Sequence, residues 1–119
     1  MGSSSPPRIL VVDDEEAITY IFERYLSIAG YQVAVANSGH AAVDAFCAQH
    51  PDLVITDFRM PGMNGSELID RLRSIEPGLP ALVISANPVD VGTMPDGVRF
   101  FSKPVSMPDL LERVKGMLS

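Results

Sequence analysis

Short apolar runs along this chain are nearly continuous instead of alternating with polar residues. Four runs, rich in Val, Ile, Leu and Phe, have this character: residues 9–12, 53–55, 81–84 and 98–101. Continuous apolar runs of this length are typical of strands that are buried on both faces of a parallel sheet. A fifth run, residues 31–36, alternates more and therefore suits a strand at the edge of the sheet.

Helical periodicity fills the gaps between these runs. Apolar residues recur at three- and four-residue spacing, which is the spacing of one helix face, in four segments. The four stripes are Ile18, Ile21, Phe22, Tyr25 and Leu26; Ala42, Val43 and Phe46; Leu68, Ile69, Leu72 and Ile75; and Leu110, Leu111, Val114, Met117 and Leu118. Ser38 and Ser106 are suited to cap the second and the last helix, and Gly30 is suited to end the first.

The segment 87–97 interrupts this regularity. It contains two prolines and two glycines, which disfavour a full helix, so we expect at most one or two turns around residues 89–93. Alternating strands and helices indicate an α/β fold with right-handed crossovers and helices on both faces of the sheet. The sequence therefore predicts a doubly wound, five-stranded parallel sheet with a shortened or irregular fourth helix.

Composition excludes several classes of protein. The chain has 119 residues, which suits one domain, and we expect a flexible leader over residues 1–7 and a folded domain over residues 8–119. The net charge of -6 argues against direct binding of nucleic acid, which needs a basic face. Because no apolar stretch has the length of a membrane span or the pattern of a signal peptide, we expect no membrane association and a cytoplasmic location.

Polar and charged side chains stand where the predicted strands end. Asp13 and Asp14 follow the first run, Asp57 follows the run 53–55, Ser85 follows the run 81–84, and Lys103 lies just after the last run. In open α/β sheets, sites form outside the carboxyl ends of the strands, near the point where the strand order reverses. We therefore expect these side chains to converge on one patch.

Three carboxylates in one cleft need a positive counter-charge. Two like charges about 4 Å apart repel by roughly 4 kcal/mol at an effective dielectric near 20. Lys103 supplies one positive charge, and Mg2+, which binds a few carboxylates together with waters and phosphate oxygens, would supply two more. A single aspartate at a strand end is often only a turn or cap residue. The complete set in this order favours a magnesium and phosphoryl site.

Four motifs carry a resemblance to a known family. They are Val11-Val12-Asp13-Asp14-Glu15; Asp57-Phe58-Arg59-Met60-Pro61-Gly62-Met63-Asn64-Gly65; Ser85-Ala86; and Lys103-Pro104. In this order and spacing the chain resembles, from Arg8 onward, the receiver domain of two-component response regulators, which has the CheY-like, flavodoxin-like fold. The resemblance implies the strand order 2-1-3-4-5.

The resemblance also implies a role for each residue of the patch. Asp57 would be the phosphoacceptor. Mg2+ would be bound by the side chains of Asp14 and Asp57, by the backbone carbonyl of Arg59 and, through water, by Asp13. Lys103 would pair with the phosphoryl oxygens.

Two further residues would respond to the phosphoryl group. Ser85 would donate its hydroxyl to a phosphoryl oxygen, and Phe100 would be the switch aromatic that moves into the space Ser85 leaves. The peptide bond before Pro104 would be cis. The chain departs from the family in its short segment 87–97, which argues against dimerisation through the fourth helix, and in having Phe100 where tyrosine is commoner.

The implied function is signalling. The domain would take a phosphoryl group from a histidine kinase or a histidine phosphotransfer protein, change conformation, and lose the group again without being a turnover enzyme. It would be a stand-alone regulator or a part of a larger one. Two alternatives stay open: a receiver-like interaction scaffold that works without phosphorylation, and a magnesium-dependent phosphohydrolase, for which so short a chain leaves little room.

Overall fold

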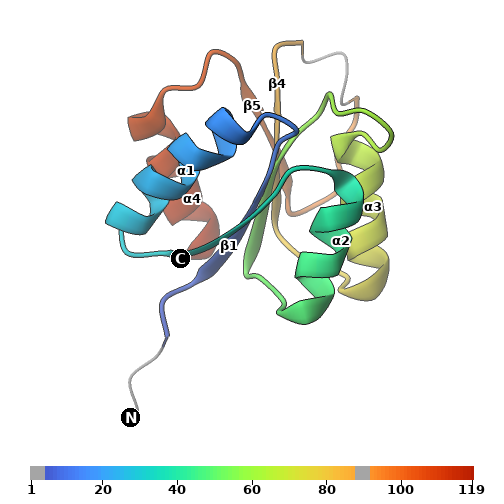
Figure 1. Cartoon of the computed structure of the whole chain (residues 1–119), viewed down its shortest axis with the longest axis horizontal. Coiled ribbons are helices and arrows are strands. Elements are labelled where there is room, and N and C mark those ends of the chain that lie inside the picture. Colours follow the sequence, from blue (N-terminus) through green and yellow to red (C-terminus); the bar gives the residue numbers. More distant parts are fainter. Residues whose placement is uncertain (1–4, 88–91) are drawn as a thin grey trace.

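The computed structural model describes residues 5–87 and 92–119, which form five strands and four helices (Figure 1). The strands are β1 (Arg8–Val12), β2 (Gln32–Ala36), β3 (Leu53–Asp57), β4 (Ala81–Ser85) and β5 (Val98–Ser102). The helices are α1 (Glu16–Ile28), α2 (Gly39–Ala48), α3 (Gly65–Ile75) and α4 (Met107–Leu118). None of the helices in this part of the chain is long and apolar enough to cross a membrane.

The five strands form one parallel sheet in the order β2-β1-β3-β4-β5. The predicted fold class and strand order are confirmed. The chain moves from β1 outward to β2 and then back across β1 to β3, so the strand order reverses at β1 and β3. A crevice at such a reversal is where α/β proteins place their sites.

Helices cover both faces of the sheet, with α1 and α4 on one face and α2 and α3 on the other (Figure 1). Alternate residues of the central strands therefore enter two separate cores, and this explains why those strands read as continuous apolar runs. The α1 and α4 face buries Ile9, Val11, Phe22, Leu26, Leu53, Ile55, Leu82, Ile84, Leu110 and Val114. The other face buries Leu10, Val12, Ala36, Ala42, Phe46, Val54, Met60, Leu68, Leu72 and Leu79.

The apolar stripe of α1 is wider than the surface that covers it. Phe22 and Leu26 are buried as predicted, whereas Ile21 and Tyr25 are 43% and 48% exposed. The shared face predicted from spacing therefore includes two residues that the fold leaves exposed. Spacing places all of them on one side of the helix, but the sheet and α4 cover only the edge of that side that carries Phe22 and Leu26.

The connection between β4 and β5 contains no helix in its described residues, 86–87 and 92–97. The helical turns expected around residues 89–93 fall largely on residues 88–91, which lie outside the described part, as does most of the expected leader. The end of the connection is held against α3, because the Arg73 guanidinium donates a hydrogen bond to the Asp96 carbonyl at 2.8 Å.

Two helix caps agree with the prediction from the sequence, and a third was not predicted. Ser38 and Ser106 cap α2 and α4 as predicted, and Gly30 has the positive φ of 104° that suits a glycine after a helix. The cap of α3 was missed. The Asn64 side chain accepts a hydrogen bond from the Glu67 amide, and the Glu67 carboxylate accepts one from the Asn64 amide, each at 2.9 Å.

This capping box gives a first prediction. Asn64→Ala should lower the free energy of unfolding by about 1 kcal/mol, because the Glu67 amide loses its acceptor. Asn64→Asp, which keeps an acceptor oxygen, should cost much less. Urea unfolding of both variants measures the difference, and equal losses would show that the cap contributes nothing specific.

Candidate functional site

The carboxyl ends of four neighbouring strands carry the predicted site residues. Asp13 follows β1, Asp57 is the last residue of β3, Ser85 is the last residue of β4, and Lys103 follows β5. Asp57 and Ser85 thus end their strands, whereas the apolar runs had suggested that they follow them. Strand pairing continues past the ends, because the Asp13 amide donates to the Ala36 carbonyl and the Lys103 amide donates to the Ser85 carbonyl.

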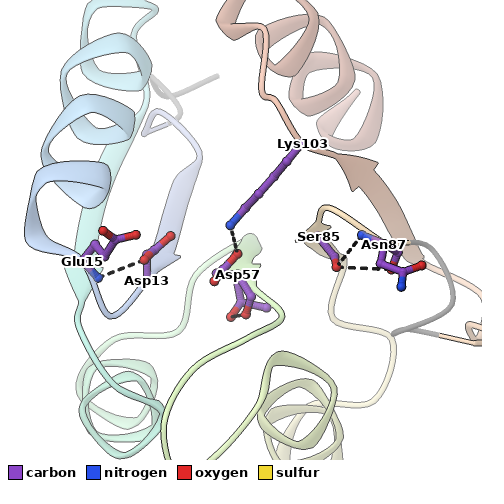
Figure 2. A network of polar contacts seen from close by, with 7 residues as sticks. Asp13, Glu15, Asp57, Ser85, Asn87 and Lys103 are labelled. Atoms are coloured by element: carbon purple, nitrogen blue, oxygen red, sulfur yellow. Dashed lines mark hydrogen bonds and ion pairs between the residues drawn. The ribbon is translucent and has the colours of Figure 1, made fainter.

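Asp57 and Lys103 form the centre of the site (Figure 2). The Lys103 ammonium lies 2.8 Å from Oδ1 of Asp57, and the Asp57 side chain is only 8% exposed. This contact joins an ammonium to a carboxylate oxygen at hydrogen-bond distance, and Oδ1 has no other polar partner in the described part of the chain. The contact with Asp57 raises the pKa of Lys103 above its usual value, although partial burial of the ammonium acts in the opposite direction.

Asp13 is buried beside this pair. Its Oδ1 accepts a hydrogen bond from the Glu15 amide at 2.9 Å, which turns the carboxylate toward the start of α1 (Figure 2). Burial raises the pKa of Asp13 from 3.8 to about 6 against the opposing effect of that hydrogen bond. The negative charges of Asp57 and Asp14 add to the rise, and Lys103 reduces it.

The three acids fit a hard divalent cation. Oxygen atoms of Asp13, Asp14 and Asp57 lie within 4.8 Å of one another, with Asp14 exposed and the other two buried. Carboxylate oxygens are the ligands that Mg2+ and Ca2+ prefer. The raised pKa of Asp13, to which the charges of Asp57 and Asp14 contribute, is a sign of a site that gains from a further positive charge.

The remaining predicted residues surround this centre. Ser85 Oγ accepts a hydrogen bond from the Asn87 amide at 3.2 Å and donates one to the Asn87 carbonyl at 3.3 Å (Figure 2). Phe100 is half-buried on β5, opposite Val83 of β4. Arg59 lies exposed in the loop between β3 and α3. The peptide bond between Lys103 and Pro104 is cis, as predicted.

Sequence reasoning missed two residues next to the acids. Asn37 and Thr19 are joined by a side-chain hydrogen bond, and Asn37 also binds the backbone of Asp13. A signal for Asn37 was present, since it follows β2 as Asp13 follows β1. Thr19 had no such signal, because one threonine within a helical segment is equally compatible with a surface position.

Known proteins match the chain along most of its length. Residues 9–115 match the response regulator receiver domain family. The response regulator MprA of Mycolicibacterium vanbaalenii is 36% identical over 121 residues, an alignment that covers 95% of this chain and 51% of that protein. The chain thus spans about half the length of the curated relatives it matches.

Solved structures give the same result. A response regulator receiver domain protein from Clostridium thermocellum superimposes with a TM-score of 0.86 at 27% identity, covering 94% of each chain. The receiver domain of the hybrid histidine kinase CckA gives a TM-score of 0.83 at 34% identity, covering 94% of this chain and 99% of that one. The sheet order, the acids at its carboxyl edge and these matches lead to one conclusion: this chain belongs to the response regulator receiver domain family.

Proposed function

We propose that Asp57 accepts a phosphoryl group from the phosphohistidine of a histidine kinase or a histidine phosphotransfer protein. The observation that carries the proposal is the buried carboxylate of Asp57, which stands beside two further acids and whose Oδ1 lies 2.8 Å from the Lys103 ammonium. Such an oxygen is available as a nucleophile, and the ammonium stands where the charge of the phosphoryl group arrives.

The step requires little from the protein beyond position and charge. A bond forms between a carboxylate oxygen of Asp57 and phosphorus as the P–N bond of phosphohistidine breaks, and the electron pair of that bond goes to the imidazole nitrogen. Lys103 then pairs with the phosphoryl oxygens. The product is an acyl phosphate, which water hydrolyses to phosphate and the free Asp57 carboxylate.

A divalent cation, which we infer to be Mg2+, belongs to the same proposal. Asp13, Asp14 and Asp57 would hold it, together with the backbone carbonyl of Arg59. When bound, it neutralises charge on the acids and on the transferred group. When no cation is bound, Lys103 alone offsets the repulsion among the three carboxylates.

Ser85 and Phe100 would turn the chemistry into a signal. A phosphoryl group offers strong acceptor oxygens to the Ser85 hydroxyl, which now contacts the Asn87 backbone. Exchange of one partner for the other would change the turn after β4 and leave space for Phe100. In this role the domain is a switch that catalyses its own phosphorylation and dephosphorylation, and it is not a turnover enzyme.

A groove beside the site offers a donor protein an apolar surface. It lies between α1 and the start of α4 and reaches Asp13 and Lys103 at one end. Its apolar lining is formed by Ile18, Ile21, Phe22, Val105 and Met107. A partner that presents a phosphohistidine could bury apolar side chains there while its imidazole reaches Asp57. The cytoplasm, where histidine kinases phosphorylate their partners, is the location we propose.

Phosphorylation by a small phosphodonor tests the proposal. Incubation with acetyl phosphate and Mg2+ should add the mass of one phosphoryl group, because the site itself supplies the catalytic groups. Asp57→Asn should abolish the addition. Asp70→Asn, which changes an exposed aspartate of α3, should leave it intact.

Three results would contradict the proposal. The first is an unchanged mass in the wild-type protein, and the second is an addition that survives Asp57→Asn. Either would favour a scaffold or a different acceptor. The third is hydrolysis of an external phosphate ester well beyond one equivalent per protein, which would indicate a phosphohydrolase.

A further inference from the structure

Asn37 connects three segments that meet at the acids. It directly follows β2, and its side-chain nitrogen donates one hydrogen bond to the Asp13 carbonyl at 2.8 Å and another to Thr19 Oγ1 at 3.2 Å. Both hydrogens of the amide group are thus used. Because a carbonyl oxygen can only accept, it is the nitrogen of the Asn37 amide that faces Asp13.

Thr19 keeps the Asn37 side chain in this orientation. Thr19 is 3% exposed, and its hydroxyl donates a hydrogen bond to the Glu16 carbonyl at 3.1 Å. The hydroxyl hydrogen is therefore occupied, and its oxygen is available as an acceptor for Asn37.

The carbonyl that Asn37 binds belongs to the peptide group between Asp13 and Asp14. A peptide group is planar, so fixing its oxygen fixes the plane that joins the two α-carbons. Asp13 is also held at its amide, by the Ala36 carbonyl, and at Oδ1, by the Glu15 amide. Asn37 completes this set, which fixes the backbone from which the two acidic side chains extend.

We propose that Asn37, oriented by Thr19, is a positioning residue that sets how tightly Asp13 and Asp14 hold a divalent cation. The inference rests on the proposed function. Without the Asn37 amide, the peptide plane between the two acids is held less firmly, and the ligand oxygens spend less time in a common geometry. Residues that orient metal ligands through hydrogen bonds typically change the affinity by about tenfold or more when removed.

Isothermal titration calorimetry with Mg2+ alone tests the inference, because it measures the Kd for Mg2+ without any phosphodonor. Asn37→Ala should weaken Mg2+ binding by about tenfold. Ser38→Ala is the matched control: it removes the neighbouring side chain, which caps α2 through the Ala41 amide and is not hydrogen-bonded to Asp13. Ser38→Ala should lower the melting temperature but leave the Kd for Mg2+ within twofold of the wild-type value.

Thr19 gives a second, independent comparison. Thr19→Val keeps the shape of the side chain but removes the hydroxyl, and it should weaken Mg2+ binding by less than Asn37→Ala does. Thr19→Ser keeps the hydroxyl and should restore the wild-type Kd. The paired variants separate orientation through a hydrogen bond from simple packing in the buried position.

The possible failures are distinguishable. Equal Kd values for Asn37→Ala, Ser38→Ala and the wild-type protein would overturn the inference, and so would equal weakening by both alanine variants. If in either case the wild-type protein is still phosphorylated on Asp57, the proposed function stands. A wild-type protein that binds no Mg2+ and takes up no phosphoryl group would overturn both.

Discussion

Replacement of Asp13 by asparagine should stabilise the metal-free protein at pH 7, by about 1–3 kcal/mol. Asp13 is buried next to two other carboxylates, and its pKa is raised from 3.8 to about 6. At pH 7 it is therefore charged in an environment that disfavours the charge. Asparagine keeps an oxygen that can accept from the Glu15 amide, so the variant loses the charge and little else.

The effect should depend on pH with a definite sign. Because the native state binds the Asp13 proton more tightly than the unfolded state, this group stabilises the fold fully below about pH 4 and progressively less as pH rises through 6. The gain from Asp13→Asn should accordingly be small at pH 4 and complete near pH 7. Urea unfolding with a chelator present, at several pH values, measures it. An Asp13→Asn variant that is less stable than the wild-type protein at pH 7 would contradict this account.

Mg2+ should stabilise the wild-type protein more than it stabilises Asp13→Asn. Binding to the native state stabilises it by mass action, and the wild-type protein has the fuller set of ligands. The melting temperature of the wild-type protein should therefore rise more with added Mg2+ than that of Asp13→Asn. Asp14→Asn is an informative control: Asp14 is exposed, so its removal should stabilise the metal-free protein less while still reducing the response to Mg2+.

Gly65→Ala should be the most damaging small substitution near the site. A Cβ at Gly65 would lie 2.6 Å from the Asp57 carbonyl oxygen and 3.0 Å from the Phe58 α-carbon. Both neighbours are backbone atoms, so no side chain can rotate away. The loop after Asp57 would have to shift, and the hydrogen bond from the Gly65 amide to the Phe58 carbonyl would be strained. We expect a loss of about 2–3 kcal/mol in the free energy of unfolding and slower phosphorylation of Asp57.

Gly116→Ala is the matched control. Gly116 lies within α4, where an added Cβ would meet no atom within 4 Å. The same chemical change should there stabilise the helix by about 0.5–1 kcal/mol, since alanine loses less backbone freedom on folding. Thermal unfolding should show a lower melting temperature for Gly65→Ala and a higher one for Gly116→Ala than for the wild-type protein. Similar values for both would show that the loop adapts at little cost.

Much of the fold was predictable because burial on both faces of a sheet leaves a direct trace in the sequence. Runs such as 53–55 and 81–84 can hardly be solvent-facing, and helices between them require parallel strands. The strand order came from the family resemblance. The faces of the helices were less predictable: spacing grouped Tyr25 with Leu26, but only the neighbouring elements decide that Leu26 is covered and Tyr25 is not.

The charged centre of the site was also predictable, since Asp13 and Asp57 stand at the carboxyl ends of buried strands and Lys103 follows the half-exposed edge strand β5. Interactions through the backbone were not. No spacing rule tells that Asn37 donates to the Asp13 carbonyl, or that the Ser85 hydroxyl pairs with the Asn87 backbone. These contacts depend on loop conformation, which the order of residue types leaves open.

The hydrogen bonds that continue the sheet past its strand ends determine which parts of the site can move. The Phe58 amide donates to the Ile84 carbonyl at 2.8 Å, and the Lys103 amide donates to the Ser85 carbonyl at 3.0 Å. The first bond joins the central strands β3 and β4, whose opening costs a large part of the free energy of unfolding, whereas the second joins β4 to the edge strand β5. The backbone that carries Asp57 is therefore fixed on the timescale of signalling. The acceptor keeps its position through many cycles of phosphorylation, and fast rearrangement is restricted to loops and to side chains such as that of Lys103, which is 42% exposed.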